Sequence, residues 1–98
     1  MLCATTVTLQ WDDNSTDEDF FVIERSVNAD NNFFTVATVQ KDVVTWTDRT
    51  TAVGNRYYYR VYASNQAGDS APSNTVSILI VEGMPSNVII TIQAENKP

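Results

Sequence analysis

Hydrophobic and polar residues alternate with a period of two along most of this chain. Val7, Leu9 and Trp11 are separated by threonine and glutamine, a pattern typical of a strand with one buried face. The same period predicts further strands at residues 20–25, 33–39, 43–47, 56–63 and 74–81. Polar turns separate these segments, and no helical period is sustained. Short strands at such spacing predict an all-β sandwich or barrel.

The alternation also assigns side chains to the two faces of each strand. Aromatic side chains that alternate on paired strands bury large areas and pack across the sheet, so core packing explains most of them. We predict a core made of Trp11, Phe21, Ile23, Trp46, Tyr57, Tyr59 and Val61. Phe20, Tyr58 and Tyr62 occupy the opposite face, where exposed aromatic side chains are a candidate interaction patch.

Composition and charge exclude several classes of function. The 98 residues are enough for one domain with one core. The net charge is −6, and the six basic residues are scattered, which argues against nucleic acids and anionic membranes as partners. With no histidine and one cysteine, the chain has no Ser–His or Cys–His pair and no His/Cys zinc cluster. We therefore predict no catalytic residue, no metal site and no cofactor.

The single cysteine, Cys3, forms no internal disulfide, which excludes small folds stapled by several bridges. It is read as an incidental or packed thiol, with an intermolecular disulfide as the alternative. The longest apolar run, residues 78–81, is far shorter than the roughly 20 residues that span a bilayer, so no membrane insertion is expected. The first residues lack the pattern of a secretion signal, which leaves a removed signal or an excised piece as the alternatives.

Four motifs in the order and spacing of one family resemble a fibronectin type III domain, in the style common in secreted bacterial proteins. They are Val7-Thr-Leu-Gln-Trp11-Asp, Phe21-Val-Ile-Glu-Arg25-Ser, Thr45-Trp-Thr-Asp48, and Tyr57-Tyr-Tyr-Arg-Val-Tyr-Ala63-Ser-Asn65. The last motif runs on into Ala67-Gly-Asp-Ser70 and Pro72-Ser-Asn74, and the resemblance covers residues 7 to about 80. The resemblance implies an immunoglobulin-like sandwich of two antiparallel sheets, located outside the cell or at its surface.

By this resemblance Trp11 is the core tryptophan of the family's second strand. Tyr57 takes the tyrosine-corner position, where the hydroxyl bonds to the backbone of the preceding loop. Thr51 stands where the family usually has a buried leucine and Val53 where proline is common. A different packing of this corner is therefore expected.

Three loop motifs have a functional and a plain interpretation. Residues 66–70 occupy the loop that carries Arg-Gly-Asp in some family members, but Ala67 replaces the arginine, so we interpret the motif as a turn. The acidic residues between Asp12 and Asp19 lack the spacing of a calcium loop and are interpreted as a solvated loop. A glycosidase pair is rejected because a single small sandwich offers no obvious cleft. Asn14 begins a formal glycosylation acceptor.

The two ends of the chain do not match a self-contained member of the family. Residues 1–82 are predicted to form the sandwich without most of its first strand, because Met1 to Thr6 is too short for a strand and a turn. Residues 83–98 form an extension whose segment 88–94 reads as a β-branched strand. A return to its own sheet would cross roughly 25–35 Å at about 3.3 Å per residue, whereas the linker Glu82–Pro85 reaches roughly 14 Å.

This mismatch suggests that the extension completes the sheet of a neighbouring copy. The residues of the donated strand would be Val88, Ile89, Ile90, Thr91 and Ile92, and such a head-to-tail contact builds a filament. Two plain readings are that a tandem array was cut inside a repeat, or that the last strand is merely appended to the domain.

Three functions follow from these observations. The first is a non-catalytic subunit of an extracellular fibre, whose partners are further copies of itself. The second is a spacer or adhesion module excised from a larger secreted protein such as a carbohydrate-active enzyme or adhesin, whose partners are neighbouring modules. The third is a binding module that uses Phe20, Tyr58 and Tyr62 to contact carbohydrate or cell-surface ligands.

Overall fold

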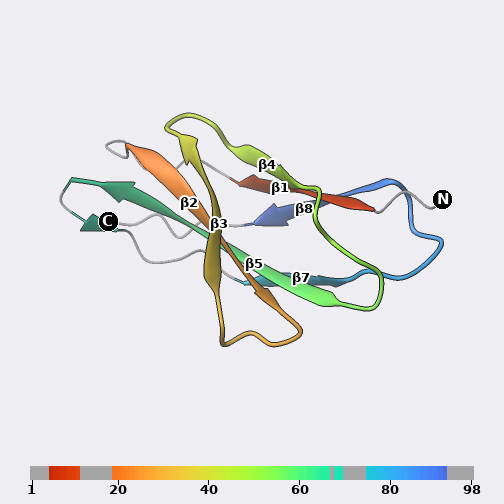
Figure 1. The fold of residues 1–98 in the computed structure, drawn as a ribbon. Coiled ribbons are helices and arrows are strands. Elements are labelled where there is room, and N and C mark those ends of the chain that lie inside the picture. The colour runs from red at the N-terminus through yellow and green to blue at the C-terminus, as the bar shows by residue number, and fades with distance from the viewer. Residues whose placement is uncertain (1–4, 12–18, 67, 70–74, 93–98) are drawn as a thin grey trace.

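The computed structural model describes residues 5–11, 19–66, 68–69 and 75–92, and these contain only strands, turns and loops. Figure 1 shows two layers of strands crossing one another. The strands are β1 (Thr6–Trp11), β2 (Phe20–Val27), β3 (Phe34–Gln40), β4 (Thr45–Asp48), β5 (Arg56–Asn65), β6 (Gly68–Asp69), β7 (Val76–Leu79) and β8 (Asn87–Ile92). The predicted all-β sandwich is confirmed.

The first sheet has the order β4-β1-β8, and the second has the order β3-β2-β5-β6 with β7 also paired to β5. The long strand β5 therefore has two partners on one side: β7 along its first half and the two-residue β6 at its end. The sequence pattern had shown residues 65–69 only as a turn. All pairs are antiparallel except β1 with β8, which is parallel.

The core lies between the two sheets. From β1 it contains Val7 and Leu9, each fully buried, and from the opposite sheet it contains Ile23 and Tyr59, also fully buried. Of the seven side chains assigned to the core from the sequence, six are buried and Trp46 is half-buried, packed against the core from the edge strand β4. The alternation places them inside because each strand presents every second residue to the facing sheet.

One aromatic contact joins the sheets at the end of β1. The ring of Trp11 meets the ring of Phe21 edge to face, with 5.8 Å between the centroids and an interplanar angle of 62°, an arrangement that aromatic quadrupoles favour. The indole Nε1 of Trp11 is buried without a hydrogen-bond partner among the described residues. Among the described residues, the side chain of Trp11 is therefore held by packing, while its backbone N–H donates to Val44 C=O at 3.0 Å.

The C-terminal strand corrects the sequence analysis. Residues 87–92 pair with β1 of the same chain, in register from Thr6 opposite Asn87 to Trp11 opposite Ile92. The prediction that the linker is too short for this return is wrong, and the premise that the strand has no place in its own sheet is wrong with it. Figure 1 shows β1 and β8 side by side and pointing the same way.

The error lies in the assumed direction of the strand. The length estimate took the antiparallel direction of the family's first strand, which requires the chain to travel the length of the domain first. The end of β7 and the start of β1 instead lie at the same pole, because both contact the loop before β5. Gly54 N–H of this loop donates to Ile80 C=O at 2.8 Å, and the Thr51 hydroxyl donates to the carbonyl oxygen of Thr5. The connection only crosses from one sheet to the other, roughly 10 Å, and β8 then runs parallel to β1.

The packing of β8 yields a matched pair of substitutions. Ile92 is fully buried in the core, whereas Ile89 on the same strand is 58% exposed. Ile92→Ala should lower the free energy of unfolding by about 2–5 kcal/mol, because it leaves a cavity in the core. Ile89→Ala should change it by less than about 0.5 kcal/mol.

Urea denaturation of the isolated chain at low micromolar concentration measures both values. Equal, small effects of the two substitutions would show that β8 does not occupy this position in solution.

Candidate functional site

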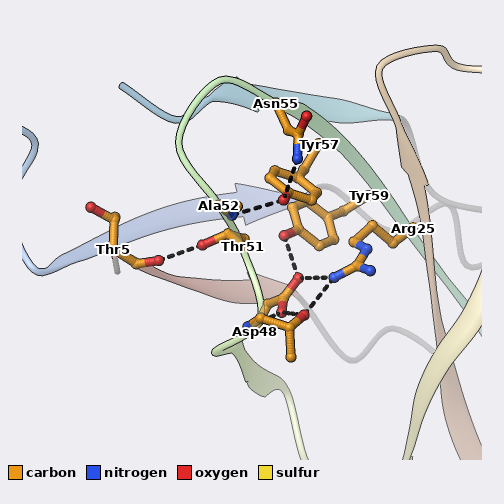
Figure 2. Close-up of polar contacts among 9 residues, drawn as sticks. Thr5, Arg25, Asp48, Thr51, Ala52, Asn55, Tyr57 and Tyr59 are labelled. Atoms are coloured by element: carbon orange, nitrogen blue, oxygen red, sulfur yellow. Dashed lines mark hydrogen bonds and ion pairs between the residues drawn. The ribbon is translucent and has the colours of Figure 1, made fainter. Parts of the chain in front are cut away.

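Among the described residues, a group of polar side chains gathers inside the sandwich, around the carboxylate of Asp48 at the end of β4. Asp48 is 1% exposed. Its Oδ2 accepts from Arg25 Nη1 at 2.8 Å and from the Tyr59 hydroxyl at 2.7 Å. Its Oδ1 accepts from the backbone N–H of Thr50 at 2.9 Å and from the Thr50 hydroxyl at 2.6 Å. Figure 2 shows these groups converging on the carboxylate.

This cluster joins the two sheets. Asp48 comes from β4 in one sheet, whereas Arg25 and Tyr59 come from β2 and β5 in the other and face each other in register. Their side chains point inward because they share the face of their strands that carries Ile23 and Val61. A buried carboxylate is tolerated here because both oxygens are paired and a cation is in contact.

Burial and hydrogen bonding act in opposite directions on the carboxylate. Burial alone raises the pKa of Asp48, but the hydrogen bonds from Thr50, Tyr59 and Arg25 outweigh it and hold this pKa below its usual range. For Tyr59, burial and the neighbouring carboxylate raise the pKa of the hydroxyl. At neutral pH Asp48 is therefore an acceptor and Tyr59 a donor, and the pair acts as a fixed link rather than a proton-transfer couple.

A second group of polar contacts fixes the loop before β5. The Tyr57 hydroxyl accepts from the backbone N–H of Ala52 at 2.8 Å and from Asn55 Nδ2 at 3.1 Å. This is the backbone contact that the tyrosine-corner position implies. Thr51 replaces the expected leucine; it is buried, and its hydroxyl donates to the carbonyl oxygen of Thr5. The hydrogen bond from Thr51 thus ties the corner to Thr5, the residue that precedes β1, as Figure 2 shows.

The outward aromatic residues do not form a continuous patch. Phe20 is 36% exposed, while Tyr58 and Tyr62 are half-buried. Arg60 lies between the two tyrosines on the same face of β5, where its Nε donates to Glu24 at 2.6 Å. The arginine also stacks on a further ring of this face, that of Phe33, 4.0 Å from the centroid. A charged pair therefore divides the surface that the binding-module reading requires.

The remaining candidates lie mostly outside the described residues. This applies to Cys3, to the acceptor Asn14, and to all of the acidic loop except Asp19. Among the residues that the structure describes, no three His, Cys, Asp or Glu side chains gather as a metal site. After the turn that follows β5, Gly68 of β6 has a φ of 139°, and its N–H donates to Asn65 Oδ1 at 3.2 Å.

Two shallow open grooves lie at the surface. One is lined by Trp46, Val36 and the residues around Asp48, and the other by Trp11, Val44 and Thr91. Both grooves are open to solvent rather than enclosed. In the first, Arg25 and Asp48 are paired to each other, and Arg49 is a further charged residue of the lining. Within the described part of the chain, no helix has the length and hydrophobicity of a transmembrane segment.

The Asp48 cluster was missed in the sequence analysis, although one signal pointed to it. Arg25 lies on the inward face of β2, in the same alternating series as the buried Phe21 and Ile23. A charge on that face needs a buried partner of opposite sign, and Asp48 at a strand end was available. The pairing of Thr51 with Thr5 had no such signal, because threonine alternates freely between exposed and buried positions in strands.

Of the comparisons with known proteins, the one with solved structures bears on the fold. No family model matches the chain, and no curated protein matches it. Among solved structures, the chain is similar to the twitchin kinase region from C. elegans (Fn31-NL-kin-CRD-Ig26), with a TM-score of 0.60 and 20% identity over 71% of this chain. The chain spans 12% of that protein. The likeness supports a fibronectin type III or immunoglobulin-like β sandwich.

The buried carboxylate makes stability depend on pH. Because the pKa of Asp48 is lowered on folding, its contribution is present above the ordinary aspartate pKa of about 4 and is lost as the pH falls through the lower folded-state value. Asp48→Asn should be less stable than the parent by about 3 kcal/mol at pH 7. This difference should shrink as the pH is lowered toward about 2.

Urea denaturation at a series of pH values measures the effect, with the exposed Asp30→Asn as control. A difference between the Asp48 variant and the parent that stays constant with pH would contradict an ionised, paired Asp48.

The contribution of the Tyr57 hydroxyl to stability can be measured against that of the neighbouring Tyr58. Tyr57→Phe should lower the free energy of unfolding by about 1 kcal/mol or more, because the N–H of Ala52 loses its acceptor. The hydroxyl of Tyr58 has no hydrogen bond to any described residue, so Tyr58→Phe should stay within about 0.5 kcal/mol of the parent. Thermal unfolding followed by circular dichroism compares them, and equal losses would rule out a structural role for the Tyr57 hydroxyl.

Proposed function

We propose that this chain is a non-catalytic structural module that spaces neighbouring modules in a longer secreted or cell-surface protein. The observation that carries the proposal is the parallel pairing of β1 with β8. β1 begins at Thr6 and β8 ends at Ile92, at opposite ends of the same strand pair. Five residue steps of about 3.3 Å each separate the two points by roughly 17 Å along the strands. Modules linked in series would therefore add their lengths.

Rigidity also supports this role. A spacer must hold its shape, and here the interior polar groups cross-link the sheets instead of lining a reaction site. Arg25 and Asp48 join the sheets, and Tyr57 fixes the loop between them. The net charge of −6 opposes non-specific association of copies. The location outside the cell rests on the resemblance to secreted bacterial domains, and the proposed partners are adjoining modules of the same polypeptide.

The head-to-tail filament remains the alternative to be tested. Strand donation would need β8 to leave β1 of its own chain and make the same contacts in another copy. The exposed connection through Gly83, which has a φ of 88°, is the segment that would have to open. Because the pairing within one chain needs no second molecule, it is favoured at low concentration, and the spacer is the first choice.

The experiment compares single-copy and two-copy chains. Sedimentation should find the single copy monomeric over a wide concentration range, and small-angle X-ray scattering should find the two-copy chain nearly twice as long. Concentration-dependent growth of the single copy that disappears on deletion of residues 84–98 would establish the filament instead. A two-copy chain no longer than a compact pair would contradict the spacer.

A further inference from the structure

The parallel pair β1–β8 consists of the two strands that lie next to the ends of the described chain. β1 is the first described strand and β8 the last, and they are neighbours over the whole length of both. Tension applied along the polypeptide would pull β1 from its start, at Thr6, and β8 from its end, at Ile92. These points lie at opposite ends of the pair, so the two strands are drawn past each other lengthwise.

Lengthwise sliding loads every hydrogen bond of the pair at once. In a parallel ladder the bonds are evenly spaced and recur along the strand; here Thr6 N–H donates to Ser86 C=O at the entry end. Strands pulled from the same end would instead separate one bond at a time. Unfolding under force is governed by the unfolding rate. This rate is lower when several hydrogen bonds must break together than when they break one after another.

We propose that the β1–β8 pair is a mechanical clamp, the element that sets the force at which this module unfolds under end-to-end tension. The inference rests on the proposed spacer role only in supposing that the module bears tension. The directions of the two strands hold whatever that role is.

Side chains strengthen the pair at the entry end. The Oδ1 of Asn87 accepts from the hydroxyl of Thr6 at 2.6 Å and from that of Thr8 at 3.1 Å. Thr8 is also 2.9 Å, hydroxyl to hydroxyl, from Thr47 on β4. One polar chain therefore runs across all three strands of this sheet. On the buried face, Ile90 and Ile92 pack into the core, so sliding would also drag apolar side chains out of it.

The residue before β1 is anchored on two sides. The Thr5 hydroxyl donates to Pro85 C=O at 3.0 Å, in the connection to β8. Its own carbonyl accepts from Thr51, in the loop before β5. Thr5 is 6% exposed. Force entering here reaches the β1–β8 pair through a fixed point of the sandwich, and the first strand does not peel away before the pair is loaded.

The decisive experiment changes only the direction of pulling. In single-molecule force measurements on a Cys3→Ser background, handles at the two termini load the pair lengthwise. Handles at the N-terminus and at Glu82→Cys, an exposed position ahead of β8, open it from one end. The terminal geometry should unfold at a several-fold higher force. Equal forces in both geometries would overturn the clamp.

A matched pair of variants tests the side-chain contribution. Asn87→Ala removes the acceptor for two threonine hydroxyls and should lower the unfolding force with terminal handles, with little change when the pair is opened from one end. Thr91→Ala, on the same exposed face of β8, should leave both forces unchanged. Equal losses in both geometries for Asn87→Ala would mean a general loss of stability and would contradict its role in the clamp.

These outcomes separate the two proposals. A two-copy chain that is extended but unfolds at the same force in both directions would keep the spacer and remove the clamp. A strong direction dependence in a chain that assembles through exchanged strands would keep the clamp and remove the spacer.

Discussion

The open edge of β1 is the constraint on which the rest of this structure depends. β1 lies in the middle of its sheet, with β4 on one side. Without a partner on the other side, its backbone groups would be unpaired and the core residues beneath them exposed, which native sheets avoid. β8 occupies that edge, and its fully buried Ile92 closes the core. The all-β sandwich is complete only with this strand in place.

The polar contacts that lock the sandwich gather at the pole where β1 begins. Asp48 lies opposite Val7 in the sheet, so the buried carboxylate and its partners sit next to the chain entry. The tyrosine corner and the contact of Thr51 with Thr5 adjoin the same place. At the opposite end of β1, Trp11 is held by packing against Phe21. The two ends of the interior are thus stabilised by different physics, hydrogen-bonded charge at one and aromatic packing at the other.

The hydrogen bonds of Asp48 show what role this buried carboxylate has in the interior. Buried carboxylates with shifted pKa values mark reactive sites when they keep a free lone pair and face a cleft. In Asp48 both oxygens already accept hydrogen bonds, and those from Arg25 and Tyr59 run between the sheets. Two of the donors that lower its pKa, Tyr59 and Arg25, also join β5 and β2 to β4. Charge here serves to fix the relative position of two layers.

The sequence by itself determined the strands, the faces they bury and the class of fold. The period of two in segments such as Val7–Trp11 and Tyr57–Val61 is a local property, and a strand that alternates in this way has only one face to bury. The resemblance to the fibronectin type III pattern also placed Tyr57 at the corner, whose contact with Ala52 spans only five residues of the chain. The existence of a strand near residue 88 was equally readable from its β-branched run.

Only the tertiary structure decided where that strand goes. The direction of β8 depends on which pole the chain has reached when β7 ends, and no local pattern contains that information. The estimate of linker length was sound for an antiparallel strand and irrelevant for a parallel one. The pairing of Arg25 with Asp48 and of Thr51 with Thr5 likewise joins residues distant in sequence, 23 and 46 positions apart. Such contacts are set by how two sheets face each other, because the packing of the layers, and not the order of residues along a strand, brings their side chains together.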